Sequence, residues 1–208
     1  MGGARAPAPG PEEVESSLPG GSGGIQNVEI GAGCLHSKGH LMPGMMRRQD
    51  KALSPQMAET LLESGEYGIL STVGQDGYPY GVPISYAYVD GAIYIHSATE
   101  GRKVTNLHSN AKVSFCVIGF SQVQPHDFTV SFATAIASGR AHRVDGEKKR
   151  KALEAIAAKY TDRSPKDIDD FIASEGEKTA VFRIDVESLT AKGDLLMAKD
   201  KFPSDVEP

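Results

Sequence analysis

Short apolar runs separated by turn residues dominate the chain between residues 67 and 186. The runs are rich in β-branched and aromatic residues, which is typical of strands. They cover residues 67–73, 78–89, 92–95, 112–120, 129–144 and 180–186. Asp90-Gly91 separates two of these runs and is typical of a two-residue hairpin turn, so we expect antiparallel strands on either side of it.

Apolar positions three or four residues apart predict helices at four places. Ser54-Pro55 can cap and begin the first helix, and Gly65 can end it. The second helix is short and covers about residues 102–109. The other two begin near Asp145 and Ser164. Their apolar faces carry Leu153, Ile156 and Tyr160 on the third helix, and Ile168, Phe171 and Ile172 on the fourth.

These elements predict a mainly β domain of about six antiparallel strands with peripheral helices. Strands and helices do not alternate as they do in proteins with parallel sheets. Strands this numerous usually close into a barrel or pack as a sandwich, because closure removes exposed edges. We therefore expect a small β-barrel with helical additions, and a chain of 208 residues has room for one such domain.

Residues 1–44 differ in composition from the rest of the chain. They hold 11 of the 23 glycines and 5 of the 12 prolines, and no Phe, Tyr or Trp precedes Tyr67. Such a segment buries too little apolar surface to offset the entropy lost on ordering. We expect a disordered leader over residues 1–44 and a folded domain over residues 45–208.

Charge and hydropathy exclude several classes of function. The formal net charge is −5 and the Lys and Arg residues are scattered, so we expect no nucleic-acid partner. No apolar run approaches the roughly 18 residues of a membrane span, and the N-terminus lacks the pattern of a secretion signal. We therefore expect a cytoplasmic protein without a membrane partner. Cys34, His36 and His40 lack a second pair of ligands, so no metal site is predicted.

The common catalytic signatures are absent from suitable structural contexts, so an enzyme of this sequence would need a cofactor for its chemistry. The segment His96–Lys103 offers a place for one, because it passes from a strand end into a helix start. Arg102 and Lys103, beside the hydroxyls of Ser97 and Thr99, form a good receptor for a phosphate dianion. An ordinary exposed turn can have the same composition, so the segment alone leaves both interpretations open.

A second unusual segment, Tyr78–Tyr86, places two prolines and a glycine inside an expected strand. Proline donates no hydrogen bond to a neighbouring strand, and glycine has no side chain to pack. The strand pairing should therefore open there and free backbone groups for a ligand. A bulge or an edge strand without any ligand is the alternative.

Together these segments resemble the FMN-binding split barrels of the pyridoxamine 5′-phosphate oxidase superfamily, and above all their nitroimidazole-resistance branch. The matching stretches are EYGILSTV at 66–73, DGYPYGVP at 76–83, IHSATEGRK at 95–103 and NAKVSF at 110–115. The resemblance continues more loosely to cover about residues 46–193. It implies an antiparallel FMN-binding split barrel and a homodimer with FMN at its interface.

The resemblance also implies the residues of the site. Arg102 and Lys103 match the pair that grips the FMN phosphate, and His96 and Ser97 match the strand-end residues beside it. The flavin ring is expected to contact the opened strand, largely through its backbone, at Val82, Pro83, Ile84 and Ser85. His96 is also the candidate catalytic residue, near the flavin or its substrate; a strand-end histidine bonded to nearby backbone is the alternative.

The activity implied by the resemblance is electron transfer from a reduced nicotinamide or similar donor to a small acceptor, such as a nitroaromatic. The basic residues that the oxidases proper carry on the strand at 81–87 have no counterpart here, and neither do their carboxyl-terminal Arg and Trp. These departures favour the nitroimidazole-resistance branch over pyridoxal phosphate synthesis. A flavin carrier, a haem-binding relative and a deazaflavin-dependent reductase are the alternatives, and an absorption spectrum separates flavin from haem.

Overall fold

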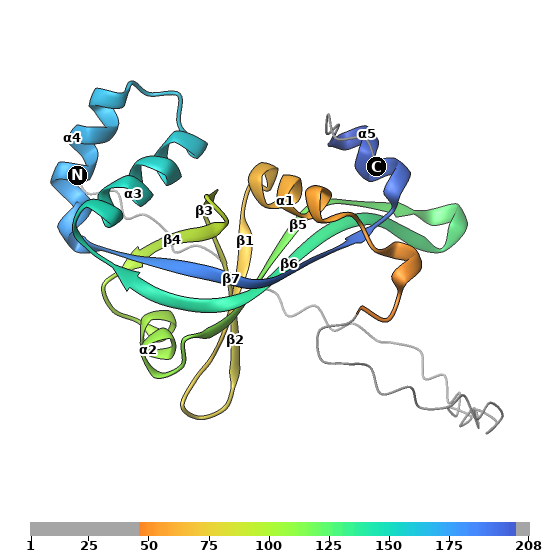
Figure 1. Ribbon diagram of the computed structural model, residues 1–208, viewed down its shortest axis with the longest axis horizontal. Helices are drawn as coiled ribbons and strands as arrows, with labels where there is room; N and C mark the ends of the chain where they lie inside the picture. The colour runs from red at the N-terminus through yellow and green to blue at the C-terminus, as the bar shows by residue number, and fades with distance from the viewer. Residues whose placement is uncertain (1–45, 203–208) are drawn as a thin grey trace, which may run out of the picture. The chain divides into compact units, whose positions relative to one another are not determined.

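Seven antiparallel strands form one sheet in the computed structural model, which describes residues 46–202 (Figure 1). The strands are β1 (Gly68–Val73), β2 (Pro79–Ile84), β3 (Tyr86–Val89), β4 (Ala92–Ala98), β5 (Lys112–Gln124), β6 (Thr129–Val144) and β7 (Thr179–Gly193). Their order across the sheet is β2-β1-β5-β6-β7-β4-β3. Because Ser85 alone joins β2 to β3, the two ends of the sheet meet. The predicted antiparallel β-barrel is therefore confirmed, with a split where the ends meet.

The run predicted as one strand over residues 78–89 divides at Ser85. Its first half, β2, pairs with β1, and its second half, β3, pairs with β4. The pairing partner does change within the segment, at Ser85, and this division accounts for the seventh strand. The two prolines and the glycine themselves lie in β2, which pairs with β1 without interruption and is an edge strand, the alternative that the sequence left open. The expected hairpin at Asp90-Gly91 is also present, and both residues have the positive φ, 49° and 73°, that such a turn requires.

Five α-helices surround the sheet within residues 46–202: α1 (Pro55–Ser64), α2 (Arg102–Ser109), α3 (Gly146–Tyr160), α4 (Pro165–Glu175) and α5 (Leu195–Lys201). The hydroxyl oxygen of Ser54 accepts a hydrogen bond from the backbone of Met57 and caps α1, as predicted. Ser164 caps α4 within a full capping box. Helix α3 begins after Asp145, as predicted, but the carboxylate of Asp145 makes no capping bond and lies 3.4 Å from Arg143 instead.

The main core fills the barrel and continues under α1. Alternate residues of β1, β5 and β6 point inward and are almost completely buried: Leu70, Phe115, Val117, Ala133, Ala135 and Ala137. Leu61 and Leu62 of α1 are fully buried in the same cluster. Helix α3 covers another part of the sheet, next to β3 and β4, and α4 packs against α3 (Figure 1). This arrangement leaves the split between β2 and β4 beside the two helices.

Some sequence-based expectations fall outside the residues that the structure describes. The predicted leader over 1–44, with Cys34, His36 and His40, is among them. Between residues 46 and 202, no helix is both long enough and apolar enough to cross a membrane. Within the same range, no three His, Cys, Asp or Glu side chains gather as metal ligands.

Candidate functional site

The split in the barrel begins at Ser85, where the chain changes from one strand partner to another. Within residues 46–202, β2 pairs only with β1 on the N-terminal side of Ser85. In the same range, the far end of β4, as far as Ala98, pairs only with β7. Among the described strands, the outer edge of β2 therefore has no neighbour, and neither does the facing edge of residues 96–98. Unpaired N–H and C=O groups at such edges can bind a ligand.

The predicted ring-contact residues lie along the edge of β2. The side chains of Val82 and Ile84 point inward and pack against the main core, whereas Pro83 is exposed. Ser85 lines a cavity on the side of α3 and α4. The structure thus leaves the backbone of this strand, together with Pro83 and Ser85, as the parts that face away from the core.

Helix α2 begins at the end of the split next to Ala98, the last residue of β4. Gly101 allows the chain to turn sharply between the two elements. Gly101 has φ = 117°, which residues with a side chain rarely adopt. The next two residues are Arg102 and Lys103, so both cations lie in the first turn of α2, where the helix dipole favours an anion.

The two cations have different surroundings. The guanidinium carbon of Arg102 lies 5.0 Å from the centre of the Tyr80 ring, and its Nη2 lies 3.9 Å from a carboxylate oxygen of Asp76. Both charged groups of this ion pair are more than half exposed, so the pair is weak. Lys103 is half-buried, and this burial lowers its pKa. Neither cation therefore has a strong partner among the described residues.

A buried hydrogen-bond chain attaches α2 to the sheet. Nδ2 of Asn106 donates to the hydroxyl of Thr72 on β1 (3.0 Å), and that hydroxyl donates to the backbone carbonyl of Tyr80 on β2 (3.3 Å). Asn106 and Thr72 are 4% and 1% exposed. These bonds hold α2 against the hairpin of β1 and β2, one turn after Arg102.

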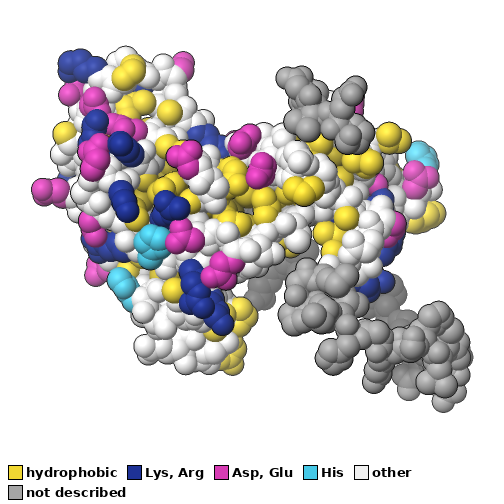
Figure 2. All heavy atoms as spheres, in the orientation of Figure 1, with side chains coloured by type: hydrophobic (Ala, Val, Ile, Leu, Met, Phe, Trp, Pro, Cys, Tyr) yellow, Lys and Arg dark blue, Asp and Glu magenta, His cyan; other side chains and the backbone are white. Residues whose placement is uncertain are grey.

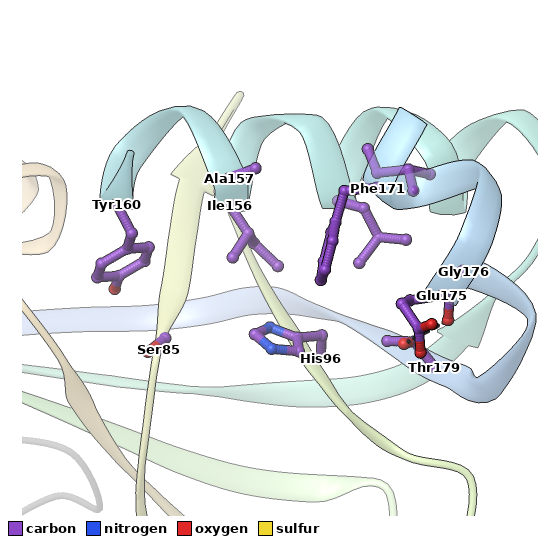
Figure 3. A pocket seen from close by; sticks show the side chains of 11 residues that line it. Ser85, His96, Ile156, Ala157, Tyr160, Phe171, Glu175, Gly176 and Thr179 are labelled. Atoms are coloured by element: carbon purple, nitrogen blue, oxygen red, sulfur yellow. Dashed lines mark hydrogen bonds between the residues drawn. The ribbon is translucent and has the colours of Figure 1, made fainter. Parts of the chain in front are cut away.

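A cavity of about 250 Å³ lies on the other side of the split, between β4 and the helices α3 and α4 (Figure 3). Its walls are Ser85, His96, Leu153, Ile156, Ala157, Tyr160, Phe171, Ile172, Glu175, Gly176 and Thr179. His96 projects from β4 beneath Ile156 and Phe171 (Figure 3). Its Nδ1 atom is buried and has no hydrogen-bond partner among the described residues.

The electrostatic surroundings of His96 keep its ring neutral. Burial lowers its pKa below the ordinary value of 6.5, and the nearby charge of Lys103 lowers it further. At pH 7 the imidazole therefore has one N–H donor and one acceptor nitrogen. The predicted alternative, a histidine bonded to nearby backbone, does not describe Nδ1, which lacks a partner in the described structure.

Tyr160, the last residue of α3, bonds to the backbone at the end of the split next to Ser85. Its hydroxyl accepts a hydrogen bond from the backbone N–H of Tyr86 (3.0 Å) and donates one to the carbonyl of Glu66 (2.7 Å). It thereby connects α3 to the first residue of β3 and to the segment before β1. The next residue toward the N-terminus, Lys159, places its Nζ atom 3.8 Å from the centre of the Tyr86 ring.

Residues 54–193 match the family described as pyridoxamine 5′-phosphate oxidase. The chain belongs to this family. A search of the curated proteins finds no match. The family match spans the whole barrel, α3 and α4, so the split, α2 and the cavity all belong to the part of the chain that the family shares.

Solved structures show the same split-barrel fold. A conserved hypothetical protein from Mycobacterium tuberculosis is 20% identical with a TM-score of 0.60, and the match covers 79% of this chain and 96% of that one. A Bacteroides thetaiotaomicron protein named for 5-nitroimidazole antibiotic resistance is 22% identical with a TM-score of 0.56, covering 68% and 85%. A FAD and heme binding protein from Mycobacterium smegmatis is 17% identical with a TM-score of 0.56, covering 69% and 73%. The expected nitroimidazole-resistance branch is thus represented among proteins of this fold.

Sequence reasoning missed the cavity wall that α3 and α4 supply. The apolar residues Leu153, Ile156, Phe171 and Ile172 were expected only as helix faces that pack on the barrel. The sequence carries no signal for this role, because an apolar helix face looks the same whether it packs on the barrel or lines a cavity. The structure reveals the difference, since α4 carries the large apolar Phe171 but buries none of its residues.

Proposed function

We propose that this member of the pyridoxamine 5′-phosphate oxidase family binds FMN in the split and uses it to reduce a small acceptor. Arg102, Lys103 and the first turn of α2 would hold the phosphate, with Ser97 beside them. The edge of β2 at residues 82–85 and the ring of His96 would hold the flavin ring. The observation that carries the proposal is the placement of two weakly partnered cations at a helix start beside an unpaired strand edge.

The residues of the site fit a phosphate dianion. Charge-assisted hydrogen bonds from Arg and Lys are strong where the cations lack other partners. The exposed pair between Arg102 and Asp76 is weak enough for a phosphate to displace it. An anion beside Lys103 would also offset the burial that now lowers its pKa.

Bound FMN would accept electrons from a nicotinamide-type donor and pass them to the acceptor. The chain's own residues would hold the cofactor, orient the acceptor and line the split around them. The apolar side chains of α3 and α4 line one side of the split. His96 is the proposed catalytic residue, and since its ring is neutral at pH 7, it orients the acceptor through a hydrogen bond rather than as a charged acid.

Absorption and titration test the cofactor assignment. Protein purified without added cofactor should show a flavin spectrum, or should acquire one when FMN is added. The Arg102→Ala/Lys103→Ala variant should bind FMN about 100-fold more weakly or worse, because each charge-assisted bond is worth roughly 1.5–3 kcal/mol. Lys148→Ala/Lys151→Ala removes two cations from α3 and serves as the matched control.

Several outcomes would contradict the proposal. Unchanged FMN affinity in the Arg102 and Lys103 variant would show that the phosphate lies elsewhere. A Soret band would indicate haem instead of flavin. Bound FMN that no nicotinamide donor reduces would indicate a carrier without turnover, and activity restored by deazaflavin but not by FMN would indicate a different cofactor.

We also propose that the protein is a homodimer and that the partner covers the outer face of the sheet. Two rows of directly opposed residues cross β2, β1, β5, β6 and β7 on the face opposite the core. The rows are Pro83, Ile69, Cys116, Ile136 and Thr190, and Gly81, Ser71, Ser114, Ser138 and Ser188. None of these ten residues is charged, although a solvated sheet face usually carries polar and charged side chains.

Other surfaces of the protein, unlike these two rows, carry many charged side chains. Lys, Arg, Asp and Glu side chains gather over α3 and α4 in Figure 2. These two rows of apolar and hydroxyl side chains are better suited to contact with a second sheet than to contact with water. Pro83 belongs both to this face and to the proposed flavin site, so a partner on the face would complete the site.

A further inference from the structure

We infer that the cavity between β4 and α3–α4 binds a single aromatic ring that carries one hydrogen-bonding group. The inference rests on the proposed function in one respect, because such a ring would be the acceptor that the flavin reduces. Binding of the ring itself depends only on residues of this chain and can be measured without FMN.

The size of the cavity indicates which part of a ligand it can enclose. A buried apolar cavity of about 150 Å³ accepts benzene, whereas sites for drug-sized ligands measure about 300–1,000 Å³. The cavity here, at about 250 Å³, lies between these values. It can enclose one ring with a substituent, whereas a flavin of three fused rings would have to protrude from it.

The walls of the cavity favour a flat apolar ligand. Ile156 lies above the cavity and His96 lies below it, and the rings of Tyr160 and Phe171 stand on either side (Figure 3). Aromatic side chains prefer stacked or edge-to-face contacts with another ring. The charged side chain in the wall, Glu175, is paired with Lys178 at 3.2 Å, so the cavity presents no free charge of its own.

One polar group in the wall lacks a partner, which is why the ring should carry a substituent. Nδ1 of His96 is buried without a hydrogen bond in the described structure. An unsatisfied buried polar atom is costly, and a ligand that bonds to the imidazole would remove that cost. Because the ring is neutral, either a donor or an acceptor on the ligand can serve, after the imidazole rotates if necessary.

Two matched probes, fluorobenzene and 4-fluorophenol, test this inference by fluorine NMR with the full-length protein. Both should bind saturably, with and without FMN. Ala157→Phe fills the cavity and should abolish binding of both probes. Ala158→Phe makes the same change at the next, exposed position of α3 and should leave binding intact.

His96→Phe separates the hydrogen bond from the shape of the cavity. This variant should still bind fluorobenzene, while its preference for 4-fluorophenol relative to fluorobenzene should fall by about 2- to 12-fold. An unchanged preference, or equal binding by the Ala157→Phe and Ala158→Phe variants, would overturn the inference. Ring binding by a protein that ignores FMN would refute the proposed function alone, and FMN binding without ring binding would refute this inference alone.

Discussion

At the scale of single residues, Lys159 stands out because its charge is buried at a cost to stability. Its Nζ atom is buried over the ring of Tyr86 and has no hydrogen-bond partner there. Burial lowers its pKa from 10.5 to about 8. The contact with the aromatic ring offsets only part of the cost of desolvation.

Lys159→Met should therefore stabilise the protein at pH 7, by about 1 kcal/mol after allowance for partial exposure. The folded state releases its proton near pH 8 and the unfolded state near 10.5, so the wild type gains stability as the pH rises between these values. The variant should lack that gain. Melting temperatures of both proteins from pH 7 to pH 10 measure it, and parallel curves would contradict the assignment.

Asp76 is the residue that competes with a phosphate for Arg102. Asp76→Asn removes the negative charge but can still accept the turn hydrogen bond from the backbone of Tyr78. FMN should bind about 1.4- to 5-fold more tightly to this variant at low salt, since an exposed ion pair is worth roughly 0.2–1 kcal/mol. Quenching of flavin fluorescence measures the affinity, and weaker binding would place the phosphate away from Arg102.

At the scale of elements, the position of α2 depends on one buried polar contact. Asn106→Ala leaves the hydroxyl of Thr72 without its donor and loosens the first turn of α2 from the sheet. The variant should lose about 1–3 kcal/mol of unfolding free energy and also bind FMN more weakly. Thr72→Val should have a similar effect, and the double variant should cost less than the sum of the two. Additive losses in chemical denaturation would show that the contact does not hold the helix.

At the scale of the whole molecule, the two uncharged rows on the outer face of the sheet are the basis for the proposed dimer. Ile136→Glu places a charge in the middle of that face and should convert the dimer to a monomer, as measured by sedimentation or light scattering. The affinity for FMN should fall when the dimer dissociates, because the face adjoins the proposed site. Leu196→Glu adds the same charge on α5, where the leucine is 84% exposed, and should leave the dimer intact.

Much of the architecture was predictable because it depends on local patterns. The turn at Asp90-Gly91, the caps at Ser54 and Ser164 and the opening near Ser85 all follow from the conformational preferences of neighbouring residues. Helix α5 was not predicted. It is short and has only one buried residue, Ala198, so it lacks a recognisable apolar face. The start of α3 at Asp145 was predicted, but its carboxylate is paired with a neighbouring arginine and does not bond to the helix backbone.

The sequence by itself determined the strands and turns, the two cations at a helix start and the family to which the chain belongs. Only the tertiary structure decided that Ser85 and His96 share a cavity with α3 and α4, and that serines from four strands align in one row. The reason is physical: local periodicity records which way each side chain points along its own element. Strand register and helix placement result from contacts between residues far apart in the chain.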